Sequence, residues 1–262
     1  MALKKYLALL AVSAFVAVGC GSKEDDLSSG TSSGGGSSAS SSSSAPAGKT
    51  GTASVSGKIT LSGKGPIMQN IDFAADATCK SQHSTPFKDQ TVEADAKGNL
   101  ADVFVYVKEG ADNYPAPSSP VVLTQKGCNY TPHVFGIQTK QTLQVVNDDP
   151  TLHNVHCMAA VNDQFNLAQP SQGTKSEKSF DKVEVPVHFK CDVHGWMHCM
   201  ACVVNNPFFA ISGTDGTFKI SNLPAGSYTL VAVQEKYGES EPQKVEIKDG
   251  ESKSLNFTFA AK

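Results

Sequence analysis

A cysteine, a histidine and a methionine follow one another at intervals of three residues: Cys191, His194 and Met197. A tight loop with this spacing can direct a thiolate, an imidazole and a thioether toward one ion. Sulfur donors with imidazole suit copper, and two histidines plus one cysteine, with a weak axial methionine, form the blue-copper (type 1) arrangement. The segment therefore predicts one mononuclear copper site that needs a second histidine from elsewhere in the chain.

The second histidine is supplied by a His-Asn-Val-His segment that starts at His153, thirty-eight residues before Cys191. Such a segment, followed at this distance by Cys-x2-His-x2-Met, resembles amicyanin and related plastocyanin-like cupredoxins. The resemblance implies four copper ligands: His153, Cys191, His194 and Met197. It also implies that Asn154 joins the two ligand loops by hydrogen bonds and that His156 is an outer or surface residue.

In cupredoxins of this type the last histidine of the loop reaches the surface within an apolar patch. By resemblance this residue is His194, and Trp196 beside it either contacts a redox partner or shields the metal from water. The implied function is one-electron transfer between a donor and an acceptor, each a cytochrome or another copper protein, without substrate turnover by this chain.

The region carries more donors than the resemblance requires: Cys157, His198, Cys199 and Cys202 join His156. Three interpretations compete. We expect first a disulfide from Cys157 to Cys199 or Cys202, and second a further metal site that combines these thiols with His198 or His156. The third is that the thiols are small buried hydrophobic groups. His198 also competes with Met197 for the axial position.

The chain has seven cysteines; apart from Cys20 near the N-terminus, two of them, Cys79 and Cys128, lie outside this cluster. Because an exported location permits disulfides, we expect Cys79 to pair with Cys128 and to close a long loop. His133, five residues after Cys128, has no ligand motif around it and is expected to pack or to face solvent.

Strand signals dominate the rest of the chain. Apolar residues alternate with other residues at 103–107, 183–189 and 255–259, and Gly-containing turns separate the runs. The pattern predicts an all-β antiparallel sandwich or barrel. In the run that ends at Phe189, Cys191 has the parity of Val183, Val185, Val187 and Phe189, so the thiol should begin on the core side.

Residues 207–262 resemble a carboxypeptidase-regulatory-like domain, a small Ig-like (transthyretin-like) β-sandwich. The signature lies at Thr214–Phe218 and Asn222–Leu230. Residues 55–100 contain a segment similar to that domain's first strand. We therefore expect a Greek-key cupredoxin at 101–206 inserted into a split Ig-like sandwich; the alternative is two sandwiches in series.

The first residues form an export signal. Lys4 and Lys5 precede an apolar run, and small residues lead to Cys20. We expect a signal peptide at 1–19, lipidation of Cys20, and a disordered Ser/Gly linker over 20–54. The protein would then be exported and attached to the membrane through its lipid only. Its location would be the outer membrane, facing the periplasm, or the cell surface.

The net charge of −3 argues against nucleic acid as a partner. No arrangement typical of hydrolytic enzymes stands out, so electron transfer is the first hypothesis. A copper-binding or delivery protein that uses the additional Cys and His residues is the second. A surface interaction protein with a structural metal is the third.

Overall fold

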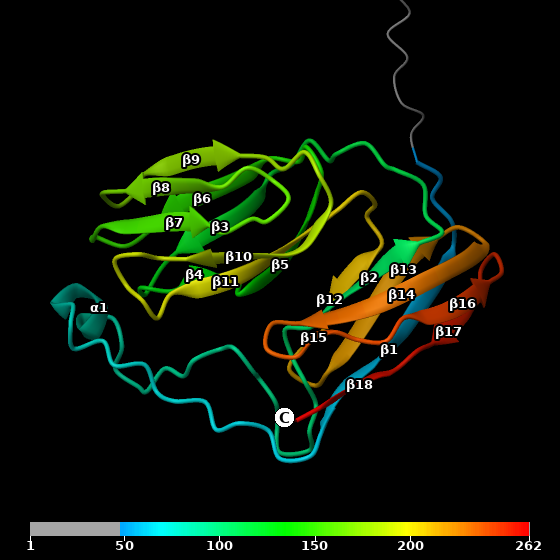
Figure 1. Cartoon of the computed structure of the whole chain (residues 1–262), viewed down its shortest axis with the longest axis horizontal. Helices are drawn as coiled ribbons and strands as arrows, with labels where there is room; N and C mark the ends of the chain where they lie inside the picture. Colours follow the sequence, from blue (N-terminus) through cyan, green and yellow to red (C-terminus); the bar gives the residue numbers. More distant parts are fainter. Residues whose placement is uncertain (1–47, 262) are drawn as a thin grey trace, which may run out of the picture. The chain divides into compact units, whose positions relative to one another are not determined.

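The computed structural model describes residues 48–261, which belong to one compact unit built almost entirely of β-strands (Figure 1). The all-β prediction is therefore confirmed. The expected signal peptide, Cys20 and most of the linker lie outside the described residues. Strand β1 begins at Ala53, two residues before the expected boundary at residue 55. Among the residues described, no helix has the length and apolar character needed to cross a bilayer.

Residues 121–204 form two sheets, which together we call the inserted sandwich. One sheet has the order β4-β3-β6-β9 and the other the order β5-β11-β10-β7-β8. The strands are β3 (Val121–Gln125), β4 (Tyr130–Thr131), β5 (Val134–Gln138), β6 (Leu143–Asn147), β7 (His153–Cys157), β8 (Phe165–Gln169), β9 (Lys175–Lys178), β10 (Glu184–Lys190) and β11 (His198–Val204).

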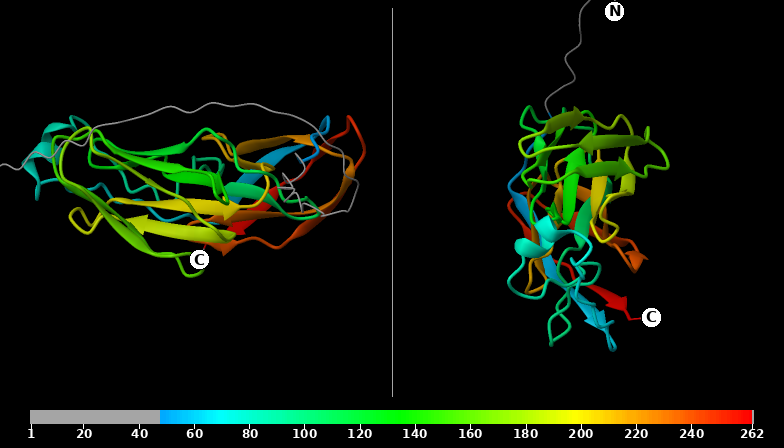
Figure 2. Two further views of the ribbon diagram at one scale, coloured as in Figure 1. Left: turned by 90° about the horizontal axis from the view of Figure 1, so that it is seen from above. Right: turned by 90° about the vertical axis from the view of Figure 1, so that its left-hand side faces the viewer.

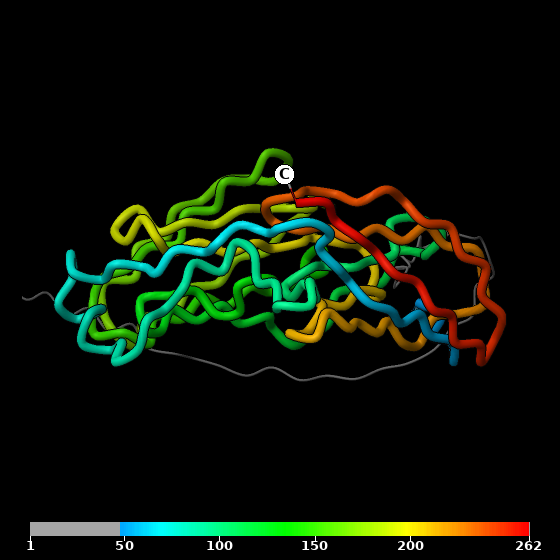
Figure 3. Tube along the Cα trace, turned by 90° about the horizontal axis from the view of Figure 1, so that it is seen from below, coloured from blue at the N-terminus to red at the C-terminus, as the bar shows by residue number. Residues whose placement is uncertain are grey.

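Strands from both ends of the described chain form two further sheets, which we call the split sandwich. One sheet has the order β13-β1-β17, with β18 also paired to β1, and the other has the order β12-β2-β14-β15, with β16 paired to β14. Figure 3 shows the blue first strand beside the red last strand. The strands are β1 (Ala53–Ser62), β2 (Phe104–Glu109), β12 (Phe209–Ile211), β13 (Thr217–Leu223), β14 (Gly226–Gln234), β15 (Gly238–Glu239), β16 (Gln243–Ile247), β17 (Ser252–Ser254) and β18 (Phe257–Ala260).

The position of β2 differs from the expected boundary at residue 101. This strand pairs with β12 and β14, so residues 104–109 belong to the split sandwich. The chain enters the inserted sandwich only after β2 and leaves it before β12. The alternating apolar pattern of β2 predicts a strand but contains no information about its partners.

Three apolar clusters lie between the four sheets. One fills the inserted sandwich and a second fills the split sandwich. The third, which includes Phe104, Met200 and Val231, lies where β11 of the inserted sandwich faces β2 and β14 of the split sandwich. Figure 2 gives two further views of the fold, in which β11 is yellow and β14 is orange. Strand β11 is thus buried on both faces.

A long segment between β1 and β2 leaves the split sandwich and returns to it. Thr60 and Asn99, near its two ends, form an isolated bridge. The segment contains the short helix α1 (Ala77–Ser81), and Phe73 and Cys79 pack against the core of the inserted sandwich. The predicted disulfide between Cys79 and Cys128 is present, with Cα atoms 5.5 Å apart. It attaches α1 to the turn between β3 and β4.

Candidate metal centre

Cys191 follows the last residue of β10 and keeps the inward parity of Val187 and Phe189, which are buried in the core of the inserted sandwich. The predicted parity is wrong at the start of the run. The register shifts between Glu184 and Val187, so Glu184 is buried. Val183 is exposed, and Val185 packs against the cluster between the sandwiches. A β-bulge of this kind inserts one residue and reverses the alternation on one side of it.

Three ligand atoms converge at the ends of β7 and β10. The donor atoms of His153, Cys191 and His194 all lie within 4.8 Å of one another, and all three residues are buried. The two Nδ1 atoms are 2.9 Å apart, and Sγ of Cys191 is 4.0 Å from Nδ1 of His194. An ion at normal bond lengths of about 2.0–2.3 Å can contact all three atoms.

Asp149 fixes the orientation of His153. Its carboxylate is fully buried, lies 2.9 Å from Nε2 of His153, and accepts hydrogen bonds from the backbone N–H groups of Gly127 and Cys128. A proton held on Nε2 leaves the lone pair of Nδ1 free for a metal. Burial lowers the pKa of His153, but hydrogen bonds to Asp149 and Cys191 outweigh it and raise the pKa to about 8.

Asp76 has the same role at His194. Its Oδ2 lies 3.1 Å from Nε2 of His194, while its Oδ1 caps α1 by accepting from the N–H groups of Thr78 and Cys79. The hydrogen bond with His194 is the main cause of the lowered pKa of Asp76. Both histidines therefore present Nδ1 to the site and Nε2 to a carboxylate.

The expectation that His194 reaches the surface is wrong. The side chain is only 4% exposed. It lies beneath α1, with Sγ of Cys79 3.6 Å from its Nε2. The segment that covers it is more than a hundred residues away in sequence, so the loop around His194 contains no sign of it.

Trp196 is partly buried rather than free on an open face. Its indole N–H donates to the carbonyl oxygen of Cys128, and its ring meets Phe73 edge-on with centroids 5.4 Å apart. The side chain therefore helps to attach the covering segment beside His194. This contact is compatible with shielding of the metal.

Asn154 joins the two ligand loops, as the resemblance implied. Its Oδ1 accepts from the backbone N–H of Asp192 at 2.7 Å and from the thiol of Cys191 at 3.2 Å. His156 lies outside the ligand cluster, half-buried, with Nδ1 3.1 Å from Asp192. Burial raises the pKa of Cys191, but a hydrogen bond with His153 and backbone N–H groups outweigh it and lower the pKa.

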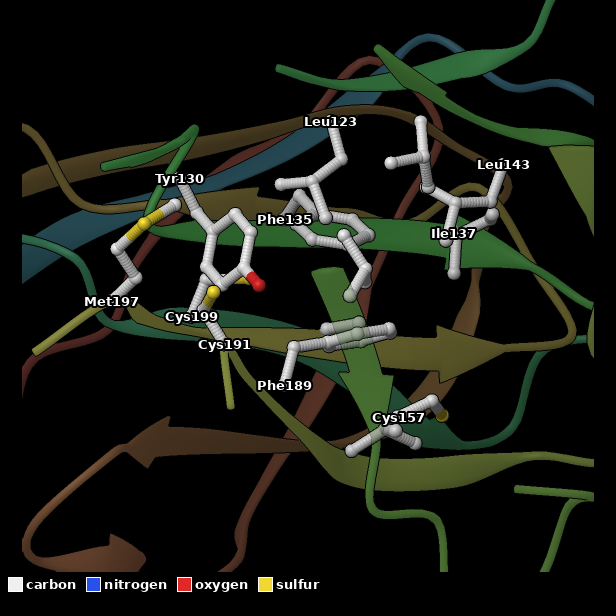
Figure 4. Packing of buried hydrophobic residues seen from close by; sticks show 14 of the residues in the cluster. Leu123, Tyr130, Phe135, Ile137, Leu143, Cys157, Phe189, Cys191, Met197 and Cys199 are labelled. Carbon is white, nitrogen blue, oxygen red and sulfur yellow. The ribbon is translucent and has the colours of Figure 1, made fainter. Parts of the chain in front are cut away.

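Met197 and His198, at the start of β11, point in opposite directions. Met197 is fully buried in the core that contains Cys191 (Figure 4). His198 instead places Nδ1 2.9 Å from Glu235 of the split sandwich. His198 is therefore not placed to replace Met197 as the axial ligand.

The expected disulfide from Cys157 to Cys199 or Cys202 is wrong, because all three thiols are free and buried. Cys157 and Cys199 flank Phe189 on opposite sides of β10, and Figure 4 shows the ring between them. Two strand spacings separate them by about 10 Å, whereas a disulfide needs Cα atoms within about 7 Å. Cys202 points to the other face of β11.

The same geometry removes the expected second site made of thiols. Among the residues described, no cluster of ligand atoms contains Cys157, Cys199 or Cys202. Cys199 and Cys202 have the C-x2-C spacing but cannot bind one ion together, because residues three apart on a strand point to opposite faces. Burial raises the pKa of both thiols, as expected for the third interpretation, small buried hydrophobic groups.

The two carboxylates that orient the histidines were not found from the sequence. Asp149 could have been found from the sequence, because it precedes His153 by four residues in the turn before β7. Asp76 was harder to find, because its only sequence feature is that it caps a short helix containing a disulfide cysteine. The disulfide connects the two, since Cys79 follows Asp76 and the N–H of Cys128 bonds to Asp149.

Comparisons with known proteins show a partial likeness to cupredoxins. No family model matches the chain, and no curated protein matches it. A solved copper-containing nitrite reductase from Thermus scotoductus SA-01 is 20% identical over 34% of this chain, with a TM-score of 0.29. This chain spans only 23% of that enzyme. An oxidized mutant of amicyanin is 16% identical, over 38% of this chain and 97% of its own, with a TM-score of 0.30. A purple cupredoxin from Nitrosopumilus maritimus is 19% identical, over 31% and 97%, with a TM-score of 0.28.

The residues themselves fit copper. The donor set is one thiol sulfur and two imidazole nitrogens, with a thioether sulfur buried in the same core. Soft sulfur with imidazole selects copper over hard cations. Oriented carboxylates behind both imidazoles are typical of histidines that bind metals. The fit thus follows from the ligands and from their hydrogen-bond partners.

Proposed function

We propose that the inserted sandwich holds one type 1 copper ion and that the protein transfers single electrons between redox partners. The observation that carries the proposal is the convergence of His153, Cys191 and His194, with Nε2 of each imidazole already occupied by a carboxylate. Met197 would be the weak axial ligand. The bound copper would supply a centre that alternates between Cu(I) and Cu(II).

The chain's own residues keep this centre rigid and dry. Asp149 and Asp76 orient the imidazoles, and Asn154 fixes the thiol while it ties β7 to the loop after β10. The disulfide between Cys79 and Cys128 holds the covering segment in place. A site that is built before the ion arrives, and that cannot relax afterwards, keeps its geometry in both oxidation states.

A redox partner would meet a different surface from the one implied by the resemblance. His194 is covered, but Leu152 is 44% exposed and Val193 is 48% exposed. Each directly precedes one of the proposed histidine ligands. We infer that these apolar side chains mark the contact surface for the donor and acceptor, a cytochrome or another copper protein. An exported, lipid-anchored protein would meet them in the periplasm or at the cell surface.

The copper-delivery alternative loses the additional thiols that helped to motivate it. Among the described residues, Cys157, Cys199 and Cys202 belong to no cluster of ligand atoms, and His194 is buried beneath α1. A delivery site needs a ligand that an acceptor protein can reach. The buried ligand set therefore favours retention of the metal over exchange.

The test is a visible absorption spectrum after addition of one equivalent of Cu(II). We expect an intense blue band that Cys191→Ser abolishes. Cys202→Ala is the matched control, because its thiol is equally buried but faces the split sandwich, and it should keep the band. Absence of the band in the wild type, or its survival in Cys191→Ser, would refute the proposal.

A further inference from the structure

A second group of metal-binding residues lies where the two sandwiches meet, outside the copper site. It consists of His133, His198 and Glu235, whose ligand atoms all lie within 4.8 Å of one another. His133 directly precedes β5, and His198 is the first residue of β11, both in the inserted sandwich. Glu235 follows β14 of the split sandwich. No sequence motif indicates this group, because its members are far apart in the chain.

Both imidazoles direct one nitrogen at the same carboxylate. Nε2 of His133 lies 2.7 Å from Oε2 of Glu235, and Nδ1 of His198 lies 2.9 Å from Oε1. The ring centroids are 5.0 Å apart and the planes nearly perpendicular, at 84°. An ion with bonds of about 2.0–2.2 Å to nitrogen and oxygen fits between these atoms after small outward shifts.

Only one of the two ring nitrogens of His133 has a hydrogen-bond partner in the described part of the chain. Its side chain is only 4% exposed. Its Nδ1 has no partner among the described residues. Nε2 is the ring nitrogen of His133 with a partner, and it is directed at Glu235 in the centre of the cluster.

A second carboxylate lies beside the cluster. Oδ2 of Asp89 is 3.7 Å from Nε2 of His198, on the side of the ring away from Glu235. Glu235 and Asp89 thus place two carboxylates against the same imidazole. A divalent cation held by the cluster would balance their two negative charges.

The donor types select the ion. Two imidazoles and a carboxylate, without sulfur, suit a borderline divalent ion such as Zn²⁺ and disfavour Cu(I). His198 is 25% exposed, so solvent reaches one side of the cluster. A water molecule can thus complete a four-coordinate site from that side.

We propose that His133, His198 and Glu235 bind one Zn²⁺ ion, and that Asp89 is a positioning residue whose carboxylate attracts Nε2–H of His198 from 3.7 Å away. The site joins the two sandwiches, since the histidines come from one and the carboxylate from the other. It is separate from the copper site, because Met197 is buried in the core of the inserted sandwich whereas His198 faces Glu235 of the split sandwich.

The test uses the full protein loaded with one equivalent of Cu(II), which occupies the thiolate site, followed by calorimetric titration with Zn²⁺. We expect one zinc ion per chain. His198→Asn and Glu235→Gln should each weaken binding more than a hundredfold, and Asp89→Asn about 10–100-fold, as found for outer partners of metal ligands. The control is His188→Asn, a histidine on β10 outside the cluster.

Glu235→Gln changes a largely buried group, so its circular dichroism is first compared with that of the wild type to show that it folds. His198→Asn changes a more exposed residue and gives an independent result. Wild-type protein that binds no zinc at micromolar concentration would overturn the proposal. Equal binding by the wild type, His198→Asn and Glu235→Gln would also overturn it. Failure of the copper site shows separately, as a missing blue band.

Discussion

Replacement of Asp149 by asparagine tests how far one buried carboxylate determines the metal site. Oδ1 accepts from the N–H of Gly127 at 2.8 Å, and Oδ2 accepts from the N–H of Cys128 at 2.7 Å and from Nε2 of His153 at 2.9 Å. In Asp149→Asn, an –NH₂ group replaces one of the two oxygens. Whichever oxygen is replaced, at least one N–H donor loses its acceptor in a site closed to water.

The expected loss of stability follows from the number of hydrogen bonds that the substitution removes. A hydrogen bond to a charged group contributes about 1.5–3 kcal/mol, and a buried donor left without an acceptor costs a similar amount. We expect the free energy of unfolding of the metal-free protein to fall by about 2–3 kcal/mol in urea titrations. Copper affinity should fall about 10–100-fold in competition with a chelator, because a neutral amide orients and polarises the imidazole less well.

Asp148→Asn is the matched control. Asp148 is the preceding residue, carries the same group, and is exposed. The same substitution there should change the free energy of unfolding by less than about 0.5 kcal/mol and leave copper affinity unaltered. If the two variants cannot be distinguished in either measurement, Asp149 does not hold His153 in place and the reasoning about the site is wrong.

Three further predictions concern the elements around the site. Cys79→Ala with Cys128→Ala removes a cross-link of sequence separation 49; we expect a loss of about 4 kcal/mol in urea unfolding, and a loss below about 1 kcal/mol would contradict this. Phe189→Ala empties the space between β7 and β11 and should cost about 3–5 kcal/mol, with Phe189→Leu costing less; equal effects would refute the packing. Burial raises the pKa of Glu184, but hydrogen bonds from Asn162 and backbone N–H groups outweigh it and lower the pKa. Its contribution is present above the unfolded pKa of about 4.5 and is lost as the pH falls, so Glu184→Gln should be less stable than wild type at pH 7 and the gap should close in acid.

The convergence of Cys191 and His194 could be predicted because its information is local. Cys191, His194 and Met197 lie within seven residues, and their donor types are specific. The prediction of which side chains before Cys191 face the core also used local information, and it was correct from Val187 onward. It was wrong before Val187, because the β-bulge depends on the pairing of β10 with β11, which no pattern within β10 encodes.

Pairing between distant segments is the information that the sequence lacked. Nothing in residues 104–109 indicates that β2 joins β14 rather than β3. Nothing near Cys157 shows that β10 runs between it and Cys199. The cover over His194 depends on a carboxylate at Asp76, and the His133 cluster depends on Glu235. The pairing of β2 with β14 and the contacts of Asp76 with His194 and of His133 with Glu235 each span more than a hundred residues. They are created by the insertion of one sandwich into the other, whereas β7, β10 and β11 meet within the inserted sandwich.

The insertion also explains how one strand can serve two sites. Strand β11 lies between two cores, so neither of its faces is free. Met197, just before the strand, is buried with Cys191, whereas His198 faces Glu235 of the split sandwich. Successive residues on a strand point to opposite sides, so the two sites are adjacent in sequence yet separated by the sheet. The contact between His198 and Glu235 therefore ties the start of β11 to the split sandwich, directly beside the residue proposed as the axial copper ligand.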